Sequence, residues 1–176
     1  FTSVYDNIGN IENRGWEFQL STEPIRESRV GGFNWNSDFN ISFLRNEVTA
    51  LYRNEPFNSG IRSINRVEVG QPIGAFQTLR FKGVDPETGD AIYDDVNGDG
   101  DITADDRTIV GSPHPKYFGG WTNTFSWKRF DLRSFLQFTQ GNKVFNAIRI
   151  FADDGGYYFD NKLKDTYDKR WKAPGD

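Results

Sequence analysis

The sequence has no cysteine, no methionine and a single histidine among its 176 residues. Without cysteine it can form no disulfide framework, no thiolate metal site and no cysteine nucleophile. The lone histidine, His114, stands between Pro113 and Pro115, where a role in a turn explains it better than general-base catalysis. No apolar run approaches the roughly 20 residues that a membrane helix needs.

The charge balance and the absence of catalytic motifs exclude further classes. Lys and Arg number 21 against 25 Asp and Glu, and the resulting net charge of -4 would repel a phosphate backbone. We therefore expect no nucleic-acid partner. The sequence has no glycine-rich phosphate loop and no serine nucleophile elbow, so we expect no enzyme and assign no catalytic residue. A glycosidase with paired carboxylates is the enzyme alternative, but the most closely spaced carboxylates belong to the motif described below.

Alternation of apolar and polar residues is the main pattern that is present, and it is clearest in residues 33–45. One face of this segment is apolar and broken only by Ser37, and the other face is polar throughout. The apolar residues are Phe33, Trp35, Phe39, Ile41 and Phe43, and the polar ones are Asn34, Asn36, Asp38, Asn40 and Ser42. The pattern lasts for about eleven residues, which suits a tilted bilayer crossing and exceeds the ~5–6 residues of most globular strands.

Residues 12–23, 117–127 and 130–140 alternate in the same way, with Phe135 as the one clear exception on a polar face. Any antiparallel sheet with one wet face can alternate like this, so a single strand does not decide between a soluble and a membrane protein. The length of the second strand favours the membrane. We therefore expect an all-β fold that is a partial antiparallel transmembrane β-barrel.

The lengths of the connections indicate which ends of the strands lie outside the cell. Short turns join the first two segments around residues 27–32 and the last two at Lys128 and Arg129, and short turns are periplasmic in such barrels. The intervening chain must then cross an even number of times. Its best strand candidate, residues 73–82, has no clean apolar face, so we expect no crossing and a large external loop over 46–116. A second external loop begins at 141 and includes a short amphipathic helix around Leu163, Tyr167 and Trp171.

Residues 95–106 match a calcium loop of the EF-hand or dockerin type. Asp95, Asn97 and Asp99 occupy positions 1, 3 and 5, and Gly100 occupies position 6, where the loop turns sharply. Asp101 would contribute its backbone carbonyl, Thr103 its side chain, and Asp106 stands at position 12. Calcium prefers six to eight oxygen ligands, and alternate side chains of a tight loop can converge on one centre. We expect a structural calcium ion bound by Asp95, Asn97, Asp99, Asp101 and Asp106.

Several motifs in order resemble the SusC/RagA family of TonB-linked outer-membrane transporters. They are 7–9 and 13–15 before the first strand, 69–74, 85–89, 95–103, 106–107, 109–113 and 115–116 in the large loop, and 119–120, 130–132, Phe135 and Gln137 after it. The resemblance implies a barrel of about 22 strands around a plug, of which this chain supplies several strands. It also implies an outer-membrane location in a Gram-negative bacterium, a SusD-like surface lipoprotein as partner, energy from TonB, and a glycan or peptide substrate.

The same resemblance indicates that the chain is a fragment. It has no signal sequence, plug domain or TonB box, so contact with TonB belongs to a part of the parent protein that is absent here. Substrate-contacting residues stay unassigned, and the lipid of the outer membrane is an expected neighbour. The alternative is a soluble calcium-stabilised β-domain that acts as an adhesin or carbohydrate-binding module. In that case the apolar face would pack on a second sheet instead of meeting lipid.

Overall fold

The computed structural model describes residues 7–154, 157, 159 and 161–176. These residues form two compact units. The first unit comprises the described residues up to Pro56, together with Val67–Ile73 and Ser112–Lys143. The second comprises Phe57–Arg66, Gly74–Gly111 and the described residues from Val144 onward. Among the described residues, no helix has both the length and the apolar character needed to cross a membrane.

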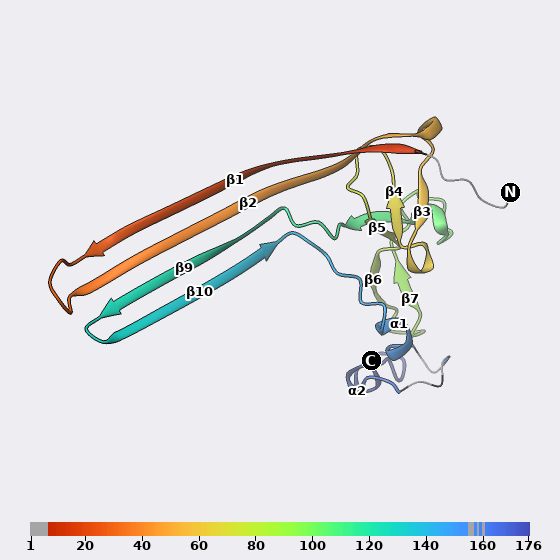
Figure 1. The fold of residues 1–176 in the computed structure, drawn as a ribbon. Coiled ribbons are helices and arrows are strands. Elements are labelled where there is room, and N and C mark those ends of the chain that lie inside the picture. The colour runs from red at the N-terminus through yellow and green to blue at the C-terminus, as the bar shows by residue number, and fades with distance from the viewer. Residues whose placement is uncertain (1–6, 155–156, 158, 160) are drawn as a thin grey trace. The chain divides into compact units, whose positions relative to one another are not determined.

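A four-stranded antiparallel sheet dominates the first unit (Figure 1). Its strands are β1 (Gly9–Arg26), β2 (Phe33–Leu51), β9 (Tyr117–Trp127) and β10 (Phe130–Gln140), in the order β1-β2-β9-β10. They cover all four segments in which alternation predicts strands. The expectation of an all-β, antiparallel fold is confirmed, and β1 and β2 are longer than the alternation indicates.

The strands β2 and β9 are direct neighbours, although 65 residues separate Leu51 from Tyr117. Their register runs from Phe33 opposite Trp127 to Phe43 opposite Tyr117 without a shift. The chain therefore leaves this sheet and returns to it at the same end. None of the other strands between β2 and β9 joins the sheet.

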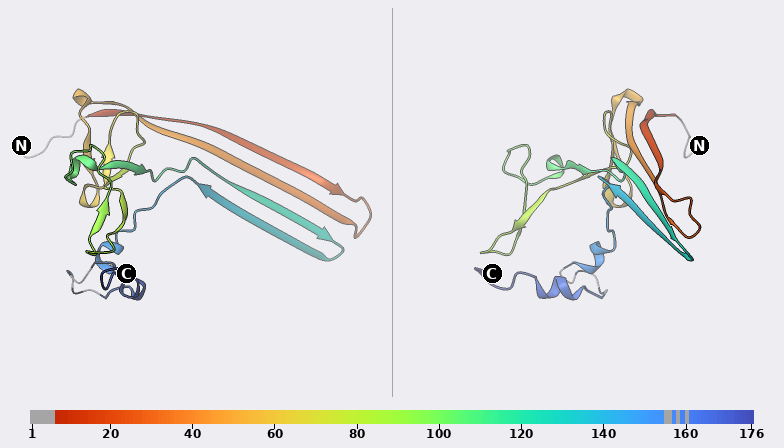
Figure 2. Two further views of the ribbon diagram at one scale, coloured as in Figure 1. Left: turned by 180° about the vertical axis from the view of Figure 1, so that it is seen from behind. Right: turned by 90° about the vertical axis from the view of Figure 1, so that its left-hand side faces the viewer.

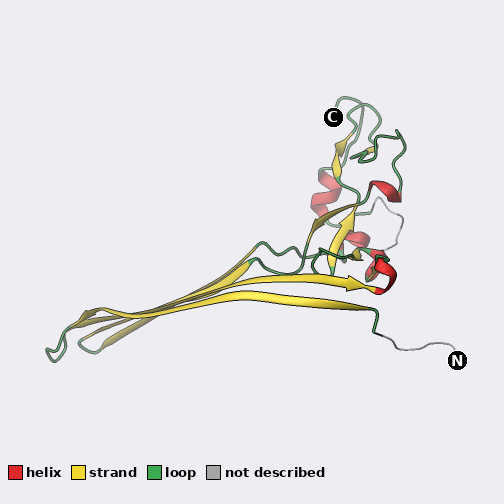
Figure 3. Ribbon diagram, turned by 90° about the horizontal axis from the view of Figure 1, so that it is seen from above, coloured by secondary structure: helices red, strands yellow, loops and turns green. Residues whose placement is uncertain are grey.

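The β1–β2 pair continues well beyond the first residue of β9 and the last residue of β10 (Figure 3). Past Phe43, β1 remains paired with one edge of β2. On the other edge, where β9 has ended, a short segment around Gly70 and Gln71 takes its place. The Val48 amide donates to the Gln71 carbonyl and the Val48 carbonyl accepts from the Gly70 amide, both at 2.9 Å. Val48 is almost fully buried there, so this extension has a small core of its own.

The second unit consists of short strands and helices, shown in Figures 1 and 2. One sheet has the order β3-β4-β5-β8 and a separate hairpin pairs β6 with β7. Their bounds are β3 (Phe57–Ser59), β4 (Asn65–Val67), β5 (Ala75–Thr78), β6 (Phe81–Val84), β7 (Ala91–Tyr93) and β8 (Thr108–Gly111). Single turns of 3₁₀-helix are η2 (Ile61–Ser63) and η3 (Ala104–Asp106), and a further one, η1 (Tyr52–Asn54), follows β2 in the first unit.

Two short α-helices, α1 (Arg149–Ala152) and α2 (Lys164–Asp168), belong to the second unit. The sequence predicts one helix through Leu163, Tyr167 and Trp171, and α2 is shorter than this. Trp171 lies outside it, where its indole nitrogen donates to the Pro86 carbonyl at 2.9 Å. The indole also occupies the space over Gly89, where an added Cβ would lie 2.6 Å from a ring carbon.

Candidate functional site

One face of the four-stranded sheet is mostly apolar on all four strands, and we call it the apolar face. The register brings side chains from all four strands into rows on this face. They are Trp16, Phe18, Leu20, Ile25, Phe33, Trp35, Phe39, Ile41, Phe43, Tyr117, Trp121, Phe125, Trp127, Phe130, Leu132, Leu136 and Phe138. Many remain open to their surroundings, and Trp16 and Phe130 are both 74% exposed. An apolar surface of this extent requires a non-aqueous or protein neighbour.

The opposite face, which we call the polar face, carries mainly amides, hydroxyls and charges. Its members are Glu17, Gln19, Ser21, Asn34, Asn36, Asp38, Asn40, Ser42, Thr122, Thr124, Ser126, Asp131, Arg133, Gln137 and Thr139. Phe118 and Phe135 are apolar exceptions. The Phe135 ring fills the space beside Gly120, where an added Cβ would lie 3.0 Å from it. The missing side chain of Gly120 therefore explains this exception locally.

The height of the apolar face agrees with a bilayer. Phe33 and Phe43 are ten residues apart on β2, which corresponds to about 33 Å along a strand and about 25 Å of height at the usual tilt of a barrel strand. Aromatic rows stand at both ends. Phe33, Trp127 and Phe130 form the row near the short turns, and Trp16, Phe43 and Tyr117 form the row at the other end. Such aromatic girdles mark the two interfaces of outer-membrane barrels.

A row of polar side chains crosses the apolar face at the level of Ser37. Ser37 is paired with Thr22 on β1 and Asn123 on β9, and Asn123 is paired with Ser134 on β10. Asn123 is buried. The sequence shows only Ser37 as a break in one strand, because a row across strands appears only when the register is known.

The predicted calcium loop is a series of tight turns held by its own side chains. The Asp95 carboxylate accepts the Gly98 amide at 2.7 Å and the Gly100 amide at 3.0 Å. Asn97 accepts the Asp99 amide at 2.9 Å, and Asp99 accepts the Asp101 amide at 2.8 Å. Gly100 has a φ of 88°, so the residue at position 6 adopts the left-handed conformation that the motif requires.

Asp106 closes this loop from its other end. Its carboxylate accepts the backbone amides of Val96 at 2.9 Å and Thr103 at 2.8 Å, and that of Asn97 at 3.4 Å. The side chain is fully buried. The hydrogen bond from the Thr103 amide, followed by those from Val96 and Asn97, lowers the pKa of the Asp106 carboxyl below its usual value.

The five predicted ligands thus belong to one loop, but they do not form a finished cage. Among the described residues, no group of three or more Asp, Glu or His side chains converges as a metal site. Asp95, Asn97, Asp99 and Asp106 engage backbone amides through oxygens that retain further lone pairs. The donor chemistry fits calcium, and binding would require these oxygens to turn toward a common centre.

Comparisons with known proteins identify the class of this sheet. No family model matches the sequence. The chain is 35% identical over 168 residues to TonB-dependent receptor P26 of Formosa agariphila, with 83% of this chain and 16% of the relative covered. It is 27% identical over 177 residues to TonB-dependent receptor SusC of Bacteroides thetaiotaomicron, with 91% of this chain and 17% of the relative covered.

The structure of the RagAB peptide transporter matches the fold with a TM-score of 0.77 at 22% identity, and the match covers 100% of this chain and 21% of the other. The sheet is therefore part of a transmembrane β-barrel of the TonB-dependent receptor class. Within that class, these matches confirm the predicted resemblance to the SusC/RagA family. It spans between 16% and 21% of the length of these matched proteins. They are named as receptors and a transporter, which is compatible with the expectation that this chain is not an enzyme.

Proposed function

We propose that this chain is a section of the wall and external surface of an outer-membrane TonB-dependent transporter that imports nutrients. The observation that carries the proposal is the apolar face, about 25 Å high, with an aromatic row at each end and a polar face behind it. Lipid meets the apolar face, and the polar face lines the interior of the barrel. Similarity to TonB-dependent receptors supports the same assignment.

The segments 46–116 and 141 onward are external loops in this proposal. The turns after β1 and β9 lie at one end of the sheet, and residues 46–116 leave and re-enter it at the other end. Because periplasmic turns are short and external loops are long in such barrels, these two segments lie outside the cell in this proposal. A substrate and a surface-bound partner would be met on that side of the membrane.

The substrate is a glycan oligosaccharide or a peptide, captured together with a SusD-like surface lipoprotein. The matched RagAB structure is that of a peptide transporter, and SusC is among the relatives. Energy comes from TonB through a part of the parent protein outside this chain. No residue described here is assigned to substrate contact.

A soluble adhesin or carbohydrate-binding module is a weaker account of the same residues. It needs a second sheet or other cover over the apolar face, yet Trp16, Phe18 and Leu20 are 74%, 57% and 59% exposed. The relatives favour the transporter as well.

We also propose that the loop 95–106 binds calcium and thereby stabilises the external segment. The left-handed Gly100 and the three Asx side chains at positions 1, 3 and 5 support this proposal. The ion would act as a staple, since none of the strands or helices next to the loop forms the helix pair that a calcium sensor opens.

Single cysteines test the assignment of the two faces, in the whole parent protein made free of other cysteines. Ile41→Cys lies on the apolar face, Ser42→Cys on the polar face, and Glu87→Cys in the proposed external loop. With a membrane-impermeant maleimide on intact cells, we expect Glu87→Cys to react at once, Ser42→Cys to react through the barrel interior, and Ile41→Cys to remain unlabelled. Equal labelling at Ile41 and Ser42 would show that the sheet does not stand in a membrane.

Uptake is tested separately, with the same parent protein in cells that have or lack TonB. Labelled oligosaccharides and peptides are supplied in parallel, and only one class should accumulate, in a TonB-dependent manner. Accumulation that is unaffected by loss of the parent protein would contradict the transport role.

A further inference from the structure

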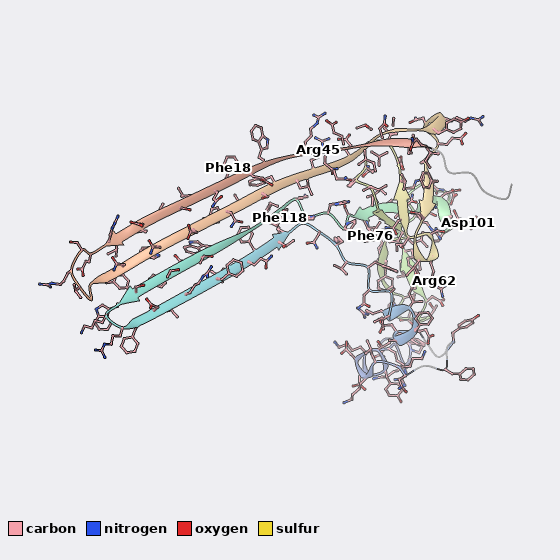
Figure 4. The ribbon with its side chains drawn as sticks, viewed as in Figure 1. Phe18, Arg45, Arg62, Phe76, Asp101 and Phe118 are labelled. Carbon is pink, nitrogen blue, oxygen red and sulfur yellow. The ribbon has the colours of Figure 1, made fainter. Side chains whose placement is uncertain are left out.

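Two arginines lie directly opposite each other just beyond the aromatic row that is far from the short turns. Trp16 pairs with Phe43, and two residues further along each strand Arg14 pairs with Arg45. No register shift falls between these pairs, so both arginines project from the apolar face. Phe18 on β1 and Arg45 on β2 are both labelled in Figure 4.

The next pair on this face is Glu12 opposite Glu47, so like charges face each other in two successive rows. Each arginine is ion-paired along its own strand, Arg14 with Glu12 at 2.6 Å and Arg45 with Glu47 at 2.9 Å. Directly opposed like charges destabilise an antiparallel pair, and opposed unlike charges stabilise it. Strand stability alone therefore does not account for two arginines side by side.

The two guanidinium groups have hydrogen-bonding capacity left over. A guanidinium carries five N–H donors. Arg14 uses Nε and one terminal nitrogen for Glu12, and Arg45 uses one terminal nitrogen for Glu47. Their side chains are 71% and 76% exposed. Because ion pairs this exposed are weak, an anion with several oxygens can compete for both arginines at once.

The height of this pair corresponds to the headgroup layer. Two residues beyond the aromatic row is about 7 Å along the strand, which leads from the boundary of the hydrocarbon into the headgroups. The short turns lie at the opposite end of the sheet, so in the proposed orientation this layer belongs to the outer leaflet. The apolar row below would hold acyl chains while the arginines meet the charged part of the same lipid.

We propose that Arg14 and Arg45 together bind the phosphate of an outer-leaflet lipid headgroup. The inference rests on the proposed function, because only a sheet embedded in a membrane presents this pair to lipid. Glu12 and Glu47 hold the two guanidinium groups in the adjacent row and limit the affinity. The site is a lipid-anchoring point on the outside of the barrel, separate from any substrate path on the polar face.

The test uses the whole parent protein, purified in a mild detergent, and native mass spectrometry with phosphatidic acid as the probe. Diacylglycerol with the same acyl chains is the probe without phosphate. We expect the Arg14→Gln/Arg45→Gln variant to retain phosphatidic acid at least about ten-fold less than the wild type, with diacylglycerol unchanged. Glu12→Gln/Glu47→Gln should retain more phosphatidic acid, because it releases donors on both arginines.

Arg133→Gln is the matched control, since it removes one exposed arginine from the polar face, and it should behave as the wild type. Excess inorganic phosphate should not displace the lipid, since the acyl chains contribute to binding. Equal retention by the wild type and the double arginine variant would overturn the inference. Membrane insertion of the same proteins is measured in parallel by heat-modifiable gel migration. A wild type that fails to insert would overturn the proposed function and the inference with it, whereas insertion without phosphate selectivity would overturn the inference alone.

Discussion

The indole nitrogen of Trp35 donates a hydrogen bond to the side-chain oxygen of Asn123 on the neighbouring strand, at 2.9 Å. A second tryptophan repeats the arrangement from the other side, since the Trp121 indole donates to the Ser37 hydroxyl at 2.8 Å. These two bonds give hydrogen-bond donors to Asn123 and Ser37 in the polar row that crosses the apolar face. A polar group facing hydrocarbon without a partner costs free energy, so the tryptophans make this row compatible with lipid.

Replacing both tryptophans by phenylalanine should destabilise the barrel. Trp35→Phe/Trp121→Phe keeps an aromatic ring at each position, including the stacking of residue 35 on Phe125, but leaves Asn123 and Ser37 without their donors. We expect a loss of about 1–3 kcal/mol of folding free energy for each unsatisfied group. Urea titration of the whole protein folded into lipid vesicles measures it. Trp16→Phe, which removes an indole outside the row, should change the value much less.

The two faces of the sheet should differ sharply in their tolerance of a charge. Phe39→Arg places a guanidinium in the middle of the apolar face, and the cost at the centre of a bilayer is about 2–4 kcal/mol. Asn36→Arg places the same side chain on the polar face of the same strand and should be nearly neutral. The folding yield in lipid vesicles and the stability against urea measure the cost of each variant. Equal costs would contradict the assignment of lipid to one face only.

The long strands could be predicted because the bilayer imposes alternation on them. Residues 33–43 alternate because one face meets apolar neighbours and the other meets water. Beyond Phe43 this constraint ends. The continuation of β2 to Leu51 and of β1 back to Gly9 was therefore missed, since their pairing relies on backbone bonds and on Val48. Arg14 and Arg45 continue the alternation in phase, and that signal could have found them.

The small sheets of the second unit could not be predicted from periodicity. Residues 73–82 show no clean apolar face because the segment divides between two sheets, with β5 ending at Thr78 and β6 beginning at Phe81. Strands of three or four residues are too short to establish a period. Glycine and Asx spacing predicted the turns of the loop 95–106, whereas the capping of its amides by Asp106 needed the structure.

The second unit should lose stability in acid. The pKa of the Asp94 carboxyl is lowered chiefly by a hydrogen bond from Lys82, that of Asp85 by the Thr88 amide, and that of Asp106 by the Thr103 amide. A carboxyl whose pKa is lower in the folded chain stabilises it fully above the unfolded pKa of about 4, and this stabilisation fades as the pH falls through the folded value. We therefore expect local unfolding below about pH 4.

Hydrogen exchange corrected for the intrinsic effect of pH measures this loss. The amides of Val96 and Thr103 bond to Asp106 and should lose protection between about pH 6 and pH 3. The Gln77 amide bonds to the Ile64 carbonyl and is the control in the same unit. Protection that is the same at both pH values would show that Asp106 does not hold the loop.

The loop 95–106 should bind calcium, and its affinity for calcium should fall when its carboxylates are neutralised. Asp95→Asn and Asp99→Asn keep the size of the side chain and an acceptor oxygen for the turn, but each removes one negative charge from the proposed site. Affinity in such loops follows the number of charged ligands, so each change should weaken binding at least about ten-fold. Isothermal titration with the whole parent protein measures it, and bound calcium should also protect the loop from proteolysis.

The choice of control decides how this experiment is interpreted. Asp106→Asn is unsuitable alone, because the same carboxylate accepts the Val96 and Thr103 amides and its loss disturbs the loop with or without calcium. Asp105→Asn is suitable, since Asp105 is the adjacent carboxylate, is exposed and is not among the five proposed ligands. If Asp105→Asn lowered affinity as much as Asp95→Asn, the effect would come from general charge around the loop. If the wild type bound no calcium, the loop would be held by its own side-chain hydrogen bonds without an ion.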